Sequence, residues 1–149
     1  MKKFKFRLQR ILDVRTVQEK VKFTLLGQER MKLEDEKYKL DLFEKESDSQ
    51  IEQIRSEKQQ PFTAWSQQAN TGYLKRLDRV IEYQKSAVSN QEEAVTNARG
   101  SYVKAHRDTE SLEIMHEKKL NDWKAETIRE EGHALDEHGM RTHSSGDNR

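Results

Sequence analysis

The sequence predicts an all-α protein: a long antiparallel two-helix coiled coil with a short helical connection and a disordered C-terminal tail. Only 32% of the 149 residues are hydrophobic and 37% are charged, whereas typical globular domains are roughly 45–50% apolar and about 25% charged. Apolar residues recur at heptad spacing in two long blocks, and the single proline lies between the blocks. A chain this poor in apolar residues is either disordered or built from helices that each bury one narrow stripe. The heptad pattern favours the helices.

The first long helix is expected within residues 1–58, from about Phe4. With Val14 at position a of the heptad, two rows are mostly apolar. Row a contains Val14, Val21, Gln28, Asp35 and Leu42, and row d contains Val17, Thr24, Met31, Tyr38 and Lys45. Phe43, Ile51 and Ile54 fall outside both rows, which indicates either local unwinding or a second apolar face.

The second long helix is expected over residues 73–131 and has a more regular pattern. Row a contains Leu74, Ile81, Val88, Val95 and Tyr102, and row d contains Leu77, Gln84, Gln91, Ala98, Ala105 and Leu112. Past Leu112 the register slips toward Met115, Leu120, Trp123 and Ile128. The flanking positions carry mainly charged and amide side chains, which is typical of a coiled coil.

Residues 59–72 are expected to separate the two helices. Pro61 cannot lie inside a helix without losing a hydrogen bond, but it can begin one, so residues 61–69 are predicted to form a short connecting helix. Asn70 or Thr71 then offers an N-cap for the second long helix. Residues 132–149 contain three glycines and no periodicity, and we expect this tail to be disordered.

Matched lengths and opposed charges predict that the two helices pack antiparallel within one chain. Each block spans on the order of 85 Å at 1.5 Å per residue. Residues 1–22 hold eight basic and two acidic residues, and residues 110–137 hold nine acidic and four basic residues. A hairpin lays these segments side by side, whereas a parallel in-register dimer places like charges together.

The composition argues against catalysis and against several kinds of site. The chain has no cysteine, which excludes a disulfide framework and a cysteine-ligated zinc site. It has no glycine-rich phosphate loop, GxSxG or HExxH motif, and its 28 basic residues nearly cancel its 27 acidic ones. We expect no enzyme activity, no cofactor, no bound metal and no nucleic acid. No apolar run approaches the ~20 residues of a membrane span, and a cytoplasmic protein is expected.

Some polar and glycine positions allow two interpretations. Gln28, Gln84 and Gln91 either specify the helix register or mark a seam that a partner completes. We favour the first interpretation for Gln28 and the second for Gln84. Gly27 and Gly100 fall nearly opposite each other in a hairpin, where each is either a tolerated weak point or a place of bending or close backbone approach.

The N-terminal stretch combines basic and apolar side chains, in the order Phe4-Lys5-Phe6-Arg7-Leu8-Gln9-Arg10-Ile11-Leu12. Such a segment can lie on an anionic membrane surface or contact DNA ahead of a parallel helical dimer. The charge distribution disfavours that dimer. Docking of a basic, apolar helix tip into a protein socket is therefore the favoured hypothesis.

Extended through Asp13-Val14-Arg15, this stretch resembles the start of the bacterial flagellar export protein FliJ family, of the type Phe-x-Phe-Arg-Leu-Gln-x-Ile/Val-Leu-Asp/Glu-x-Arg. The chain length, the central break and the two charged helices are similar as well, so the resemblance covers essentially the whole chain. It implies a soluble component of the flagellar type III export apparatus, with a coiled coil similar to the γ stalk of rotary ATPases. The implied location is the cytoplasmic face of the cell membrane, at the flagellar base.

The resemblance also implies partners and the surfaces that bind them. The paired helix ends would insert into the hexameric export ATPase FliI, another side would contact the cytoplasmic domain of the export gate protein FlhA, and some members also handle export chaperones. The implied ATPase-facing residues are Phe4, Phe6, Arg7, Leu8, Arg10, Ile11, Trp123 and Ile128. The implied gate-facing residues are Phe43, Tyr73, Leu77, Val80 and Gln84.

This sequence departs from the family pattern at the gate-facing surface. Gln84 stands where relatives can carry histidine, and the aromatic neighbours of Phe43 are replaced by Glu46 and Gln50. Leu77 is equally well explained as a seam residue. The alternatives are the equivalent stalk protein of a virulence type III secretion system and a generic homo-oligomeric coiled-coil scaffold.

Overall fold

The structure is a computed structural model of the 149-residue chain. It describes residues 3–57 and 63–146, with the backbone alone described at residues 138, 139 and 141–146. The described residues form two long helices, α1 (Gln9–Glu57) and α2 (Ala64–Gly146), and no strand. The predicted all-α fold is confirmed. No helix in these ranges combines the length and the apolar character needed to cross a membrane.

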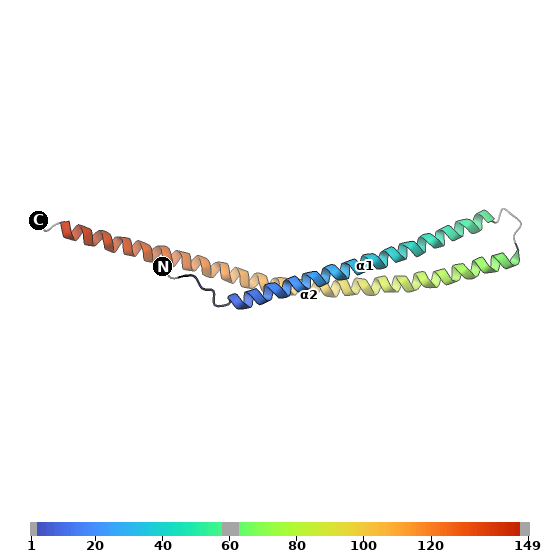
Figure 1. The fold of residues 1–149 in the computed structure, drawn as a ribbon, viewed down its shortest axis with the longest axis horizontal. Coiled ribbons are helices and arrows are strands. Elements are labelled where there is room, and N and C mark those ends of the chain that lie inside the picture. Colours follow the sequence, from blue (N-terminus) through green and yellow to red (C-terminus); the bar gives the residue numbers. More distant parts are fainter. Residues whose placement is uncertain (1–2, 58–62, 147–149) are drawn as a thin grey trace. The chain divides into compact units, whose positions relative to one another are not determined.

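The chain divides into two compact units. The hairpin unit is Val21–Val103, and the terminal unit is Met1–Lys20 with Lys104–Arg149. In the hairpin unit α1 and α2 lie side by side and run in opposite directions (Figure 1). The contact of Glu29 with Gln91 and that of Glu36 with Gln84 show the same antiparallel order. The predicted antiparallel pairing is confirmed.

The heptad rows predicted for the second helix are confirmed by burial. All eleven residues from Leu74 to Leu112 that were placed in rows a and d are buried or half-buried in α2. Beyond them the half-buried residues are His116, Leu120, Trp123 and Thr127, while Met115 and Ile128 are exposed. His116 and Trp123 continue row a, so the predicted register slip is present only in row d, which moves to Leu120 and Thr127.

The heptad register predicted for the first helix is wrong. The side chains that face α2 include Leu26, Leu33, Leu40, Phe43 and Ile54, and the first three lie two residues before the predicted row a. The predicted rows instead form an outer stripe on α1, whose apolar members are Val14, Val17, Val21, Met31, Tyr38 and Leu42. These are between 47% and 71% exposed. The helix carries two apolar stripes of equal period, and periodicity alone does not tell which one is packed.

The start of α1 also differs from the prediction, because the helix begins at Gln9 rather than near Phe4. Residues 3–6 are not helical, and a turn at Arg7 and Leu8 precedes the helix. The Gln9 amide donates to the Phe6 carbonyl at 3.1 Å, and the Leu12 amide donates to the Leu8 carbonyl at 3.0 Å. Leu8 therefore occupies the N-cap position, where its side chain offers no oxygen to the free amides of the first turn.

The start of α2 lies earlier than predicted. Thr63 caps the helix, since its Oγ1 accepts a hydrogen bond from the Ser66 amide at 3.2 Å. The helix continues from Ala64 through Asn70 and Thr71 without a break, so the predicted connecting helix is present as the first turns of α2. The Thr71 hydroxyl bonds the Gln67 carbonyl within the helix at 2.8 Å instead of capping a new one. Pro61 lies outside the described residues.

The end of α2 extends beyond the predicted boundary at residue 131 and reaches Gly146. Residues 132–137 are exposed, and so are the apolar side chains of Leu135 and Met140, each at 74%. This segment is helical in the structure but buries none of the side chains described there. Disorder of the tail in solution stays a prediction.

The two glycines inside the hairpin unit do not mark a close approach of the helices. A Cβ atom added at Gly27 or Gly100 meets no neighbouring atom within 4 Å. This finding excludes a close backbone approach, and the interpretations as tolerated weak points or as places of bending stay open.

Two leucines of α1 provide a test of its register. Leu26 is 4% exposed and Leu42 is 47% exposed. We expect Leu26→Ala to lower the free energy of unfolding by about 2–3 kcal/mol, because a buried side chain is lost, and Leu42→Ala to change it by less than about 0.5 kcal/mol. Urea unfolding followed by circular dichroism measures both. Equal losses, or a larger loss for Leu42→Ala, would contradict the register of the structure.

Candidate partner-binding surfaces

Two glutamates of α1 and two glutamines of α2 form a repeated set of hydrogen bonds in the hairpin unit, which we call the polar ladder. The Gln84 amide donates to the backbone carbonyl of Glu36 at 3.0 Å and to its carboxylate. The Gln91 amide makes the same two bonds to Glu29, at 3.1 Å to the carbonyl. Both partners are displaced by one heptad, so the motif repeats in register. Gln84 is only 6% exposed.

The carboxylates of the polar ladder are held by neighbouring lysines as well. Lys32 Nζ lies 2.7 Å from Glu29 Oε1, and Lys39 Nζ lies 2.7 Å from Glu36 Oε1. The hydrogen bond from the lysine, followed by that from the glutamine, lowers the pKa of each glutamate below its ordinary value. The polar ladder therefore joins the two helices most strongly when both glutamates are ionised and in register.

The polar ladder reverses the preference for the seam amides. Gln84, for which partner binding was favoured, bonds to α1 within the chain. Gln28, for which register specification was favoured, is exposed on the outer stripe. Gln84 and Gln91 are therefore the amides that disfavour a slipped pairing, because a shift of α1 along α2 would place them beside apolar neighbours.

The predicted gate-facing residues all lie in the hairpin unit, where four of them extend along about three turns of α2 and one belongs to α1. Phe43 follows Glu36 by one heptad and Leu77 precedes Gln84 by one heptad, which places Phe43 opposite Leu77. Leu77 is buried at 8% exposure, and Phe43 is half-buried. Tyr73 and Val80 lie beside this seam with 37% and 40% exposure.

Tyr73 is tied to α1 at the edge of the hairpin. Its hydroxyl donates to Glu46 Oε1 at 3.1 Å, and this hydrogen bond raises the pKa of the Tyr73 phenol. Glu46 is one of the residues that replace an aromatic side chain of the family pattern. The edge therefore presents a phenol whose hydroxyl is bound to α1, and Val80 follows about two turns further along α2.

An aromatic cluster dominates the terminal unit. The ring of His116 is 5.4 Å from that of Phe4 and 4.9 Å from that of Phe6, both edge-on, and the rings of Phe4 and Trp123 are 5.9 Å apart. Residues two apart in an extended segment point to the same side, whereas in a helix they lie about 200° apart. The non-helical conformation of residues 3–6 is what lets both phenylalanines reach His116.

The other predicted ATPase-facing residues also lie in the terminal unit, but not in this cluster. Leu8 is half-buried, and Arg7, Arg10, Ile11 and Ile128 are exposed. The structure therefore brings Phe4, Phe6 and Trp123 together and leaves two arginines and two isoleucines facing solvent. His116 was not predicted as a site residue. A Phe-x-Phe pair ahead of an uncapped helix is the signal that points to an extended segment.

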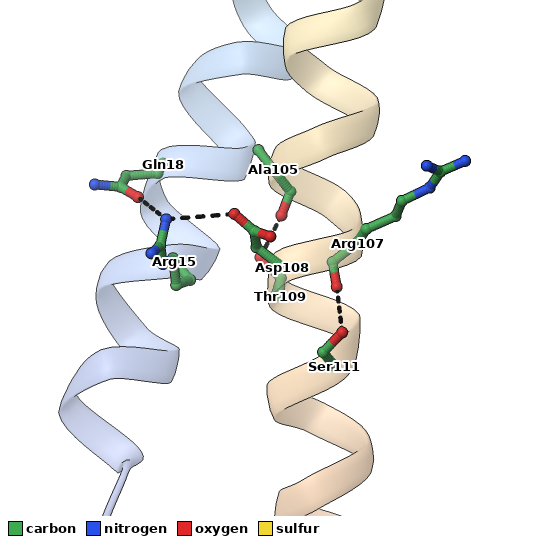
Figure 2. A network of polar contacts seen from close by, with 7 residues as sticks. All are labelled: Arg15, Gln18, Ala105, Arg107, Asp108, Thr109 and Ser111. Carbon is green, nitrogen blue, oxygen red and sulfur yellow. Dashed lines mark hydrogen bonds and ion pairs between the residues drawn. The ribbon is translucent and has the colours of Figure 1, made fainter.

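A set of polar contacts lies further along the terminal unit, and one of them joins α1 to α2 (Figure 2). Arg15 Nη1 lies between Gln18 Oε1 at 3.4 Å and Asp108 Oδ2 at 3.5 Å. Thr109, only 2% exposed, turns its hydroxyl to the Ala105 carbonyl at 3.1 Å, while Arg107 points away from α1 (Figure 2). The Arg15–Asp108 pair has the basic-to-acidic sense that the charge distribution predicted.

A second contact of the terminal unit runs in the opposite sense. His106 Nδ1 lies 2.7 Å from Glu19 Oε1, and this hydrogen bond raises the pKa of His106. Because the pKa of His106 is raised on folding, its contact with Glu19 contributes to stability below about pH 6.5. This contribution is lost as the pH rises through the folded-state pKa. The contact is exposed, so salt weakens it.

Comparison with known proteins identifies the family to which this chain belongs. The model of the family described as flagellar FliJ protein matches residues 4–147. The chain belongs to the FliJ family. It is a structural component of flagellar or type III export, as the N-terminal motif and the two helices implied. The match begins at Phe4, the first ring of the aromatic cluster.

Two further comparisons add little to the family match. Among curated proteins no match is found. A solved structure from Chlamydia trachomatis, CT670, described as a YscO homologue, has a TM-score of 0.46 and 19% sequence identity over 99% of each chain. Within the described ranges, no group of three or more His, Cys, Asp or Glu residues is placed to hold a metal ion.

Acid is expected to weaken the hairpin unit of this FliJ protein through the polar ladder. Since the pKa of Glu29 and Glu36 is lowered on folding, their contribution is present above the ordinary value of 4.5 and is lost as the pH falls through the folded-state value. The melting temperature should therefore drop below about pH 4.5, and the drop should be shallower in Glu29→Gln/Glu36→Gln.

The matched control for this acid titration is Glu82→Gln/Glu93→Gln, which changes two exposed glutamates of α2. It should retain the wild-type pH profile. Thermal unfolding by circular dichroism between pH 3 and pH 7 compares the three proteins. Identical profiles for both double variants would show that the polar ladder does not carry the acid sensitivity.

Proposed function

We propose that this protein is a stalk-like component of the flagellar type III export apparatus, which couples the export ATPase FliI to the export gate protein FlhA at the cytoplasmic face of the membrane. The family match across residues 4–147 carries this proposal. The separation of the two candidate surfaces supports it, because the ATPase-facing residues belong to the terminal unit and the gate-facing residues belong to the hairpin unit.

The ATPase-facing surface has the chemistry of a steering tip. Arg7 and Arg10 are exposed next to Ile11, which is 49% exposed. Exposed basic groups accelerate encounter with an acidic lumen, and apolar groups at the same place gain contact after insertion. Paired charges along α1, such as Lys32 with Glu29 and Lys45 with Asp41, support a long helix in water by about 0.2–0.5 kcal/mol each.

The gate-facing surface is proposed to be the edge of the hairpin unit rather than the whole predicted row. Tyr73 and Val80 are accessible there. Leu77 and Gln84 are covered by α1, so contact with them requires a local separation of the helices. Phe43 of α1 lies opposite Leu77 and is half-buried beside this edge. Export chaperones are a further class of partner for this surface.

One observation favours a different function, that of a homo-oligomeric coiled-coil scaffold. The outer stripe of α1 is apolar and exposed at Val21, Met31 and Tyr38, as a second helix-packing seam would be before assembly. Sedimentation at micromolar concentration decides between the two, since a monomer supports the stalk-like role and a stable oligomer supports the scaffold.

The arginines of the tip provide the test of ATPase binding. We expect Arg7→Glu/Arg10→Glu to weaken binding to FliI at least tenfold and to abolish any stimulation of ATP hydrolysis, because like charges then meet at the ring. Arg76→Glu/Arg79→Glu is the matched control, with the same spacing on the exposed side of α2. Titration with FliI, followed by phosphate release, measures both. Unchanged binding of the first variant would overturn the proposed tip.

Two tyrosines of α2 provide the test of gate binding. Tyr73 lies at the hairpin edge and is 37% exposed, whereas Tyr83 is 77% exposed. We expect Tyr73→Ala to weaken binding to the cytoplasmic domain of FlhA about tenfold, by loss of a ring at the centre of the contact, and Tyr83→Ala to change it less than twofold. Isothermal titration with each variant is the measurement. Equal effects of the two substitutions would place the gate contact elsewhere.

A further inference from the structure

We propose that residues 3–8, the arm, are a clasp that covers part of the ATPase-facing surface and opens when the ATPase binds. The inference rests on the proposed function, because Phe4 and Phe6 are among the residues expected to enter the ring. In the structure their rings are occupied within the chain by His116 and Trp123. The same two side chains therefore pack against α2 within the chain and are also proposed to contact the ATPase.

The extended conformation of the arm comes from its contacts with α2 and not from its own sequence. The arm contains neither glycine nor proline, and the residue at the N-cap of α1, Leu8, gives no side-chain cap. The first turn of α1 contains no acidic residue either, so nothing there stabilises the positive end of the helix. The boundary at Gln9 is thus weakly defined, and the helix can lengthen toward Phe4.

A lengthened α1 presents a different surface. Phe4, Leu8 and Ile11 then fall at spacings of four and three residues and line one face of the helix. Phe6 and Arg10, four residues apart, line the neighbouring face. In the clasped conformation Ile11 is exposed while both phenylalanines lie against α2. Opening the clasp assembles a continuous apolar and basic tip from residues that are now split between two places.

The clasp is weak enough to be opened by a binding partner. It consists of ring contacts on one side of the arm, while Lys3, Lys5 and Arg7 on the other side are exposed. A ligand that binds only the open form has its apparent affinity reduced by the fraction of molecules that are open. Loosening the clasp must therefore tighten ATPase binding, whereas removing the phenylalanines must weaken it.

Substitution of His116 tests this opposite pair of effects. His116→Ala removes the ring that both phenylalanines contact and leaves the arm intact. We expect it to tighten FliI binding on the order of threefold to tenfold, and Phe4→Ala/Phe6→Ala to weaken it by at least tenfold. The control is His133→Ala, an exposed histidine of α2 in the same unit, which should bind as the wild type does.

A pair of variants tests the helical form of the open arm. Lys5→Gly and Lys5→Ala remove the same charge and leave every ring of the arm in place, but glycine disfavours a helix and alanine favours one. Lys5→Gly should therefore bind FliI severalfold more weakly than Lys5→Ala. Equal binding by the two variants would overturn the lengthening of α1. Both substitutions lie outside α2, so a change in the folding of α2 cannot account for a difference between them.

Tryptophan fluorescence reports on the clasp without any partner. In a Trp65→Phe background the only tryptophan emission is that of Trp123, whose ring contacts Phe4. Phe4→Ala and His116→Ala should shift this emission toward that of a water-exposed indole, and Lys5→Ala should not. An emission unchanged by Phe4→Ala would overturn the clasp.

The possible results separate the inference from the function on which it rests. If the wild-type protein does not bind FliI, the proposed function is overturned and the inference with it. If the wild type binds and His116→Ala binds equally or more weakly, the function stands and the clasp as an inhibitory contact is overturned. Tighter binding by His116→Ala together with weaker binding by Phe4→Ala/Phe6→Ala supports both.

Discussion

The hydrogen bonds of Gln84 and Gln91 to the glutamates of α1 are the constraint on which the hairpin depends. A two-helix structure buries only a narrow apolar stripe, and leucine side chains accept slipped pairings at small cost. A buried amide does not, because displacement by one turn moves it away from the carboxylate that accepts its hydrogen bond. Since the motif recurs after one heptad on both helices, a slip of one heptad still leaves one of the two amides opposite a residue other than glutamate. Register, and with it the level of Tyr73 and Val80, follows from this repeat.

The periodicity of the sequence predicted the buried rows of α2 correctly but not those of α1. The difference lies in the number of apolar stripes on each helix. In α2 the seam from Leu74 to Leu112 has no competitor of equal length, so rows and burial agree. In α1 a row through Val14, Val21 and Leu42 competes with a row through Leu26, Leu33 and Leu40. The choice between them depends on which side the amides of α2 face, which is information from the other helix. Local spacing cannot supply it.

The arm was beyond sequence reasoning for a related reason. Residues 3–8 lack any residue that breaks a helix, and local propensity favours continuing α1 to Phe4. The non-helical conformation of residues 3–6 is explained by rings more than a hundred residues away in sequence, because His116 contacts both phenylalanines and Trp123 contacts Phe4. Tertiary contacts of this kind override weak propensities at helix ends, where few hydrogen bonds are lost by unwinding. The membership of the FliJ family was nevertheless predictable, since it depends on the order of residues in the arm and not on its conformation.

At both candidate surfaces, some of the side chains proposed to bind a partner are already packed within the chain. Binding through them therefore requires part of the chain to move. Leu77 and Gln84 are accessible to a gate protein only if α1 moves away, which exposes Phe43 and breaks one repeat of the polar ladder. Tyr73 and Val80 require no such movement. A partner that binds the closed hairpin gains contact area at the edge and breaks no buried hydrogen bond. Such binding is therefore favoured over binding that separates the helices. The terminal unit differs, because the arm lies against α2 through the ring contacts of Phe4 and Phe6 and not through buried amides, so the part of the chain proposed to move lies at the end proposed to enter the ATPase.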